Sequence, residues 1–190
     1  MNFIKLKNQF TFNSTDVIEK QEIVTIGGGA LRNYTIDINT PNIQKIYQII
    51  PSYARHLFSI SAVKISHLLA PHVDDVKTSI LFYVRAGSFK TQFYKVASEL
   101  PVIDYSVIEN NKQEINDLNS YRPEIYRIED LIEQDSYVAA DFDAWCVNGS
   151  VPHAIMHCDQ CDKVNRTFIL YKTDLPFHTV LELLKQTNSI

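Results

Sequence analysis

The sequence predicts an α+β fold whose core is mainly β: an antiparallel sheet sandwich or barrel buttressed by helices. Short segments rich in Val, Ile, Phe and Tyr recur along most of the chain. Helical periodicity is confined to a few places, and strand–helix–strand alternation is rare. The 190 residues, 45% of them hydrophobic and 21% charged, show no repeat or linker. We therefore expect a single domain over 1–190.

The strands are predicted from β-branched and aromatic enrichment between turn signals. In chain order the predicted strands are 23–26, 34–38, 58–65, 78–84, 91–96, 144–147 and 167–171. Three glycines at 27–29 separate the first two predicted strands. No Gly-Lys-Ser/Thr follows these glycines, so they indicate a turn rather than a phosphate-binding loop.

Two helices and one shorter helix are predicted from capping residues and apolar spacing. Thr40 and Pro41 are an N-cap and a first helical residue, and apolar residues then follow at i, i+3, i+4 and i+7 as far as Ile50. The same spacing after Pro176 predicts a helix near the C-terminus. Apolar residues within 128–132 predict a shorter helix.

Charge, hydropathy and cysteine content exclude several classes of protein. The net charge of −4 is not accompanied by a basic block, so it does not support a nucleic-acid partner. The first residues lack a secretory signal, and no apolar run approaches the roughly 20 residues of a membrane span. We expect a soluble, cytoplasmic protein. Its three cysteines, too few for a disulfide framework, are expected to be reduced thiols.

One histidine and one aspartate stand two residues apart in the segment Pro-His-Val-Asp, at His72 and Asp74. In an extended segment these side chains project from the same face. A second histidine on a neighbouring strand would complete a 2-His-1-carboxylate set, which is the signature of non-haem Fe(II) oxygenases. The alternative is an ordinary ion pair in a loop, which contributes little to stability.

Three further segments follow this pair in a fixed order. The predicted strand 78–84 contains Tyr83 near its end, a Pro-His-Ala-Ile segment carries His153, and Arg166 precedes the last predicted strand. With His72 and Asp74, this order resembles the 2-oxoglutarate- and Fe(II)-dependent oxygenases, specifically the prolyl-4-hydroxylase-like branch. The resemblance covers about residues 55–172.

The resemblance implies a double-stranded β-helix, a jelly-roll or cupin-like fold, with Fe(II) bound by His72, Asp74 and His153. It implies that Arg166 pairs with the far carboxylate of the cosubstrate 2-oxoglutarate, assisted by the Tyr83 hydroxyl. It further implies a dioxygenase that uses O₂, with ascorbate as a reductant, and releases succinate and CO₂. The expected reaction is hydroxylation of a small molecule or peptide, proline among the candidates, at a site bordered by the long polar stretch 98–122.

The sequence leaves alternatives open for the third metal ligand and for the register of the strands that carry His153 and Arg166. The interval from His153 to Arg166 is longer than the family usually shows, so His157 is an alternative ligand. A hairpin symmetric about residues 159 and 160 would place His153 directly opposite Arg166.

The cysteines and the overall function leave further alternatives. Cys158 and Cys161 lie in a polar turn, which is either a simple insertion or part of a zinc site with His157 and Cys146. A non-catalytic β-helix module with a binding or structural role, and a zinc hydrolase using the same triad, are the rival functions.

Overall fold

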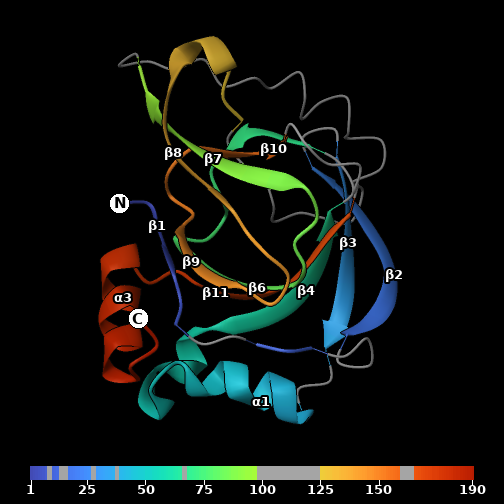
Figure 1. Ribbon diagram of the computed structural model, residues 1–190, viewed down its shortest axis with the longest axis vertical. Helices are drawn as coiled ribbons and strands as arrows, with labels where there is room; N and C mark the ends of the chain where they lie inside the picture. Colours follow the sequence, from blue (N-terminus) through green and yellow to red (C-terminus); the bar gives the residue numbers. More distant parts are fainter. Residues whose placement is uncertain are drawn as a thin grey trace.

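The computed structural model describes residues 1–7, 10–12, 17–26, 29–36, 39–65, 68–97, 125–158 and 165–190. Within these residues two antiparallel sheets face each other, and two helices lie beneath the larger sheet (Figure 1). The fold is α+β and mainly β, a jelly-roll-like architecture, which confirms the predicted class. The stretch 98–122 and Cys161 lie outside the described residues. No described helix has the length and apolar character needed to span a bilayer.

The larger sheet contains seven described strands in the order β1-β9-β6-β11-β4-β3-β2. All of its neighbouring pairs are antiparallel. Six of the predicted strands are confirmed here, with bounds that differ by up to six residues. The strands are β1 (Phe3–Lys5), β2 (Val17–Ile26), β3 (Gly29–Ile36), β4 (Ser59–Ile65), β6 (Thr78–Arg85), β9 (Ala144–Asn148) and β11 (Arg166–Thr173).

The smaller sheet contains four described strands in the order β5-β10-β7-β8. Only β7 was predicted as a strand in its own right. The strands are β5 (Leu69–His72), β7 (Phe89–Val96), β8 (Leu131–Val138) and β10 (His153–His157). From β4 to β7, and again from β8 to β11, consecutive strands of the chain lie in different sheets, so residues close in sequence can lie in different layers.

The two long helices form where the sequence predicts them. Helix α1 (Pro41–Gln48) begins after Thr40, whose hydroxyl accepts a hydrogen bond from the backbone N–H of Ile43. Helix α3 (Phe177–Gln186) follows Pro176. A 3₁₀ turn, η2 (Ser52–Leu57), connects α1 to β4.

The helix predicted at 128–132 is wrong. A single 3₁₀ turn, η3 (Ile128–Asp130), is followed directly by strand β8. The apolar residues that imitate helical spacing do not cover a core, since Ile128 and Ile132 are 56% and 54% exposed. Strand β8 is an edge of the smaller sheet, where apolar side chains can face solvent.

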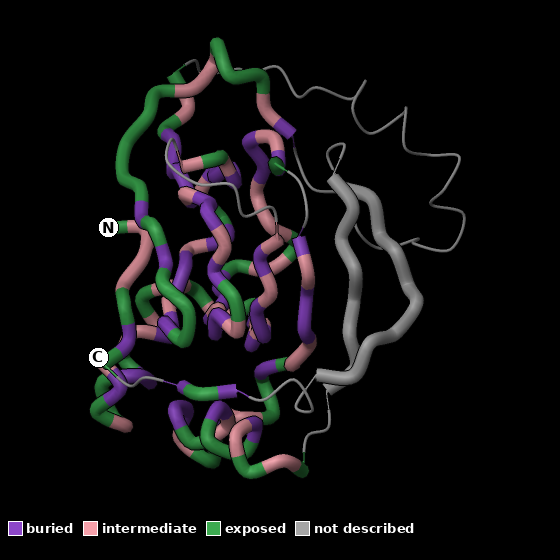
Figure 2. Tube along the Cα trace, turned by 45° about the vertical axis from the view of Figure 1, so that its right-hand side comes forward, coloured by how far each residue is buried: buried purple, intermediate pink, exposed green. Residues whose placement is uncertain are grey.

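Alternation along the strands divides the buried side chains into two clusters, and buried residues run through both layers in Figure 2. The outer cluster lies between the larger sheet and the helices. The inner cluster lies between the two sheets. The outer cluster includes Ile43, Ile46, Ile50, Phe82, Cys146, Ile169, Val180 and Leu184, and the inner cluster includes Val63, Leu69, Tyr83, Phe89, Phe93, Tyr137, Ile155 and Phe168.

Candidate functional site

Three predicted ligands meet at one end of the space between the sheets. His72, Asp74 and His153 each offer one ligand atom, and these atoms lie within 4.8 Å of one another. His72 ends β5, His153 begins β10, and the two residues are paired across these neighbouring strands. Asp74 follows β5 in the connection to β6. We call this end of the interior the metal end.

Backbone carbonyls fix the tautomer of both imidazoles. The His72 Nδ1 lies 2.7 Å from the carbonyl oxygen of Ala70, and the His153 Nδ1 lies 2.9 Å from that of Val151. A carbonyl oxygen only accepts, so each Nδ1 carries a proton, and in the neutral ring the lone pair is therefore on Nε2. Both Nε2 atoms lie 3.7 Å from Asp74 Oδ1. This is the arrangement by which proteins orient metal-binding histidines.

The charge state of His72 also suits a metal ligand. Burial lowers the pKa of His72 to about 4, and the neighbouring His153 lowers it further, against the opposing effect of Asp74. The imidazole of His72 is therefore neutral at neutral pH, and a histidine must be neutral to bind a metal. The ring of Phe93 on β7 flanks His153, with 5.6 Å between ring centroids.

A glycine that the sequence analysis missed positions the carboxylate. The carbonyl oxygen of Gly149 accepts a hydrogen bond of 2.9 Å from the backbone N–H of Asp74. A Cβ atom at position 149 would lie 2.5 Å from the carbonyl oxygen of Val76 and 2.9 Å from Asp74 Oδ2. Only a glycine allows the aspartate to pack this closely against the chain. One glycine among turn residues offers no signal of this role in the sequence.

The predicted cosubstrate residue Arg166 is buried between the sheets, with 1% of its surface exposed. Its Nε donates to the carbonyl oxygen of Ala86, its Nη1 to the Thr91 hydroxyl and its Nη2 to the carbonyl oxygen of Phe89, at 3.1–3.2 Å. No ion pair joins it to a carboxylate of the described residues. Two of its five N–H groups are left by these bonds, one on each terminal nitrogen.

Hydroxyl groups of Thr91, Tyr83 and Tyr137 lie around the Arg166 side chain, and we call these four residues the arginine pocket. The Tyr83 ring stacks beneath the Arg166 guanidinium at 4.9 Å, and its hydroxyl lies 2.9 Å from that of Tyr137. Tyr137 is itself hydrogen-bonded to Thr91, and burial raises its pKa well above the usual range. Tyr83 thus faces the interior. Thr91 and Tyr137 carried no recognisable signal in the sequence, because their role depends on which strands pack together.

The metal end and the arginine pocket are connected along β7. His153 pairs with Phe93, and Ile155 pairs with Thr91, which binds Arg166. The predicted hairpin register, with His153 opposite Arg166, is wrong. Arg166 pairs with Ile65 on β4, because β10 and β11 belong to different sheets. The two residues face one interior from opposite layers rather than lying side by side.

The alternative metal ligands lie elsewhere. His157 is exposed at the far end of β10, where its ring stacks on Phe89. Cys146 is buried in the outer cluster, on the other face of the larger sheet. Among the described residues, only His72, Asp74 and His153 form a group that could hold a metal ion. Of the described cysteines, Cys146 and Cys158 are not in a disulfide bond.

Comparison with known proteins gives distant structural likeness. No family model matches the sequence, and no curated protein matches it. The fold is similar to HygX of Streptomyces hygroscopicus, solved with nickel, 2-oxoglutarate and hygromycin B, at a TM-score of 0.42 and 10% identity over 90% of this chain and 81% of that one. A 2OG-Fe(II) oxygenase family protein of Burkholderia pseudomallei gives a TM-score of 0.39 at 10% identity, over 83% and 74% of the two chains.

Seed proteins are similar to the same degree. Vicilin from hazelnut, Corylus avellana, gives a TM-score of 0.37 at 11% identity, over 82% of this chain. The chain spans 30% of the length of that vicilin. Oxygenases and seed globulins thus occur among the similar structures. Function must be argued from this chain's own residues, because one fold serves many activities.

Proposed function

We propose that the protein is a 2-oxoglutarate- and Fe(II)-dependent dioxygenase that hydroxylates a small molecule or peptide. One observation carries the proposal: a 2-His-1-carboxylate group and a buried guanidinium without a carboxylate partner among the described residues face the same interior. The first is a site for a divalent cation. The second is a site for an anion. Together they match a cosubstrate that binds a metal at one end and carries a negative charge at the other.

The donor set at the metal end fits a ferrous ion. Two imidazoles and one carboxylate would hold the metal on one side and leave coordination positions open for other ligands. When bound there, Fe(II) would supply the O₂ chemistry that the side chains themselves cannot perform. The contribution of His72, Asp74 and His153 is a fixed set of lone pairs, oriented by the carbonyls of Ala70 and Val151.

The arginine pocket fits the far carboxylate of 2-oxoglutarate. A buried cation is costly unless an anion compensates it, and the two remaining N–H donors of Arg166 suffice for bidentate binding of a carboxylate. Thr91, which binds Arg166, lies two residues along β7 from Phe93, which flanks His153. Two residues of strand span about 7 Å, a distance suited to a five-carbon dicarboxylate.

The inner cluster contributes by excluding water. Phe89, Phe93 and Tyr83 are fully buried around the line between the two sites. Exclusion of water strengthens the interaction of Arg166 with a carboxylate and protects a reactive centre from side reactions. A proline substrate and membership of the prolyl-hydroxylase-like branch are our finer proposals, and they rest on the sequence resemblance alone.

The test measures binding and turnover separately. Purified protein is loaded anaerobically with Fe(II), titrated with 2-oxoglutarate, and then given O₂ and ascorbate while succinate is measured. We expect one 2-oxoglutarate per chain and slow succinate release, abolished by His72→Ala. Metal binding without 2-oxoglutarate binding or succinate would contradict the proposal and favour the non-catalytic module. Zinc-dependent hydrolysis without O₂ would favour the hydrolase.

A further inference from the structure

A polar row crosses the inner face of the larger sheet beside the metal end. Strand pairing places Ser59, Lys172, Ser79 and Val147 next to one another on β4, β11, β6 and β9. Lys172 shares its face with Phe168, and Ser79 shares its face with Tyr83, both members of the inner cluster. The row therefore faces the space between the sheets, where an apolar core alone would require no charge.

Both halves of this row lie near the chain segment that carries the metal ligand Asp74. Lys172 Nζ lies 3.9 Å from Asp75 Oδ2, and Asp75 is the next residue after Asp74. On the other side, Val147 is two residues from Gly149, where an added Cβ would lie 2.9 Å from Asp74 Oδ2. A molecule bound at the row would therefore lie next to the metal end, at the opposite side from Arg166.

Two features of the row indicate an absent ligand. Ser79 is 3% exposed, and its hydroxyl has no hydrogen-bond partner among the described residues, which is unusual for a buried polar group. Lys172 and Asp75 form a loose pair, with side chains 30% and 35% exposed. A pair at this distance and exposure contributes little to stability. Both charges can therefore accept new partners at little cost.

We propose that this row is the substrate subsite and that it takes a free amino acid. The ammonium group would bind Asp75, and the carboxylate would bind Lys172 and the Ser79 hydroxyl. Adjacent opposite charges complement the two adjacent charges of a zwitterion, so the one weak ion pair is replaced by two charge-assisted interactions. The inference rests on the proposed function for its chemistry, and it favours a free amino acid over a residue within a peptide, which has neither charge.

The first experiment is a binding screen that does not depend on turnover. Protein loaded with Co(II) and 2-oxoglutarate is mixed with the twenty free L-amino acids, and binding is detected by saturation-transfer NMR and then measured by calorimetry. We expect at least one amino acid to bind. Its N-acetyl and carboxamide derivatives should bind at least tenfold more weakly. Absence of binding by every amino acid, or equal binding of the blocked derivatives, would overturn the subsite.

Paired variants assign each charge. Lys172→Met should weaken binding of the free amino acid at least tenfold but leave the already weak binding of its carboxamide unchanged. Asp75→Asn should weaken binding of the free amino acid at least tenfold but leave the already weak binding of its N-acetyl derivative unchanged. The control is the remote exposed pair of Lys185 and Glu182 on α3, whose variants Lys185→Met and Glu182→Gln should bind as the wild type does. If the control variants lose amino-acid binding to the same extent, the assignment of the two charges to Lys172 and Asp75 is contradicted.

The same samples separate this inference from the proposed function. The Co(II) absorption spectrum and the dissociation constant of 2-oxoglutarate are measured for each variant. Normal metal and 2-oxoglutarate binding without amino-acid binding would overturn the subsite and leave the oxygenase proposal standing. Amino-acid binding that depends on Lys172 and Asp75 without 2-oxoglutarate binding would support the subsite and contradict the oxygenase.

Discussion

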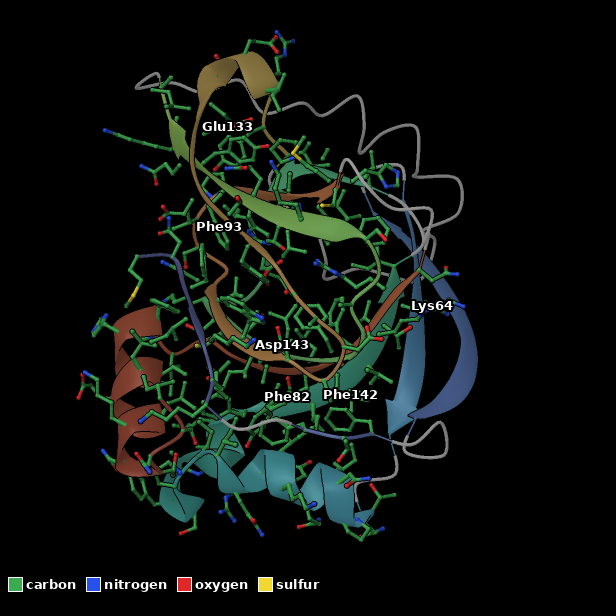
Figure 3. All side chains as sticks on the ribbon, in the orientation of Figure 1. Lys64, Phe82, Phe93, Glu133, Phe142 and Asp143 are labelled. Carbon is green, nitrogen blue, oxygen red and sulfur yellow. The ribbon has the colours of Figure 1, made fainter. Side chains whose placement is uncertain are left out.

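The two faces of the larger sheet differ in what they bury. The outer cluster packs aliphatic and aromatic side chains against α1 and α3, and Phe82 points from β6 toward the helices (Figure 3). The opposite face carries Arg166 and looks onto His153 and Thr91 of the smaller sheet, and all three are buried among the side chains of the inner cluster. One layer of strands thus carries an apolar core on one face and, on the other, apolar side chains among which buried polar and charged groups also lie.

This difference assigns separate roles to the two faces. Apolar burial is the dominant favourable term in folding, whereas buried charges and imidazoles cost free energy unless they are compensated. We infer that the outer cluster contributes most of the free energy of unfolding. The buried binding groups of the inner face lower it. Variants on opposite faces of the same strands should therefore separate stability from binding.

The largest effect should come from the outer face. Phe82→Ala removes a fully buried ring that packs against Phe10 with 4.7 Å between centroids. We expect the free energy of unfolding, measured by denaturant titration, to fall by about 3–5 kcal/mol. Metal affinity of the folded protein should stay within about twofold of the wild type. A large loss of metal affinity would show that the two faces are not independent.

The matching change on the inner face is His153→Ala. We expect metal affinity to fall more than about 100-fold, since removal of a ligand should exceed the 10–100-fold loss typical of an outer partner of a ligand. The stability of the metal-free protein should change less than in Phe82→Ala. The control is His157→Ala on the same strand, which should bind metal normally. Loss of metal binding in the control instead would restore His157 as the ligand.

Arg166→Lys keeps the buried charge but removes the planar fork. We expect the dissociation constant of 2-oxoglutarate, measured by calorimetry, to rise about 30-fold, or about 2 kcal/mol, because a lysine cannot bind a carboxylate bidentately. Metal affinity without 2-oxoglutarate should be unchanged. Unaltered 2-oxoglutarate affinity would remove Arg166 from the cosubstrate pocket.

Gly149→Ala tests whether packing behind Asp74 matters to the metal. The new Cβ would meet the Val76 carbonyl oxygen and Asp74 Oδ2 well inside normal contact distances. The carboxylate must then shift, and we expect metal affinity to fall about tenfold, or about 1.4 kcal/mol. Metal titration checks this value, and calorimetry of unfolding reports the cost to the fold. Full metal affinity would show that Asp74 tolerates displacement.

The sequence predicts where strands and helices lie better than it predicts which strands pair with one another. Strands such as 78–84 and 167–171 carry strong β-branched and aromatic enrichment, and the structure confirms them. Strand β8 was missed because its centre is polar and its apolar residues imitate a helical face. Such an edge strand receives its hydrogen bonds from β7, a partner distant in sequence.

The candidate site shows the same difference between features set by local sequence and features set by packing of distant segments. The closeness of His72 and Asp74 follows from local alternation, which a sequence displays directly. The register of His153 and Arg166 could not be obtained this way, because a hairpin assumes that consecutive strands are neighbours in one sheet. Gly149 and Tyr137 were missed because each acts through a contact that exists only after the sheets pack.

The smallest effect should come from Tyr83, which lies back to back with Phe82 on β6. Tyr83→Phe removes one buried hydroxyl and leaves the ring that stacks on Arg166. A hydrogen bond of this kind contributes about 1 kcal/mol, so we expect 2-oxoglutarate affinity to fall about fivefold if the hydroxyl donates to the cosubstrate. The control is Tyr94→Phe on β7, whose hydroxyl bonds to the Met156 sulfur. If Tyr83→Phe and Tyr94→Phe lose the same stability and bind 2-oxoglutarate equally well, Tyr83 is a packing residue. Arg166 alone would then form the anion site of the inner face.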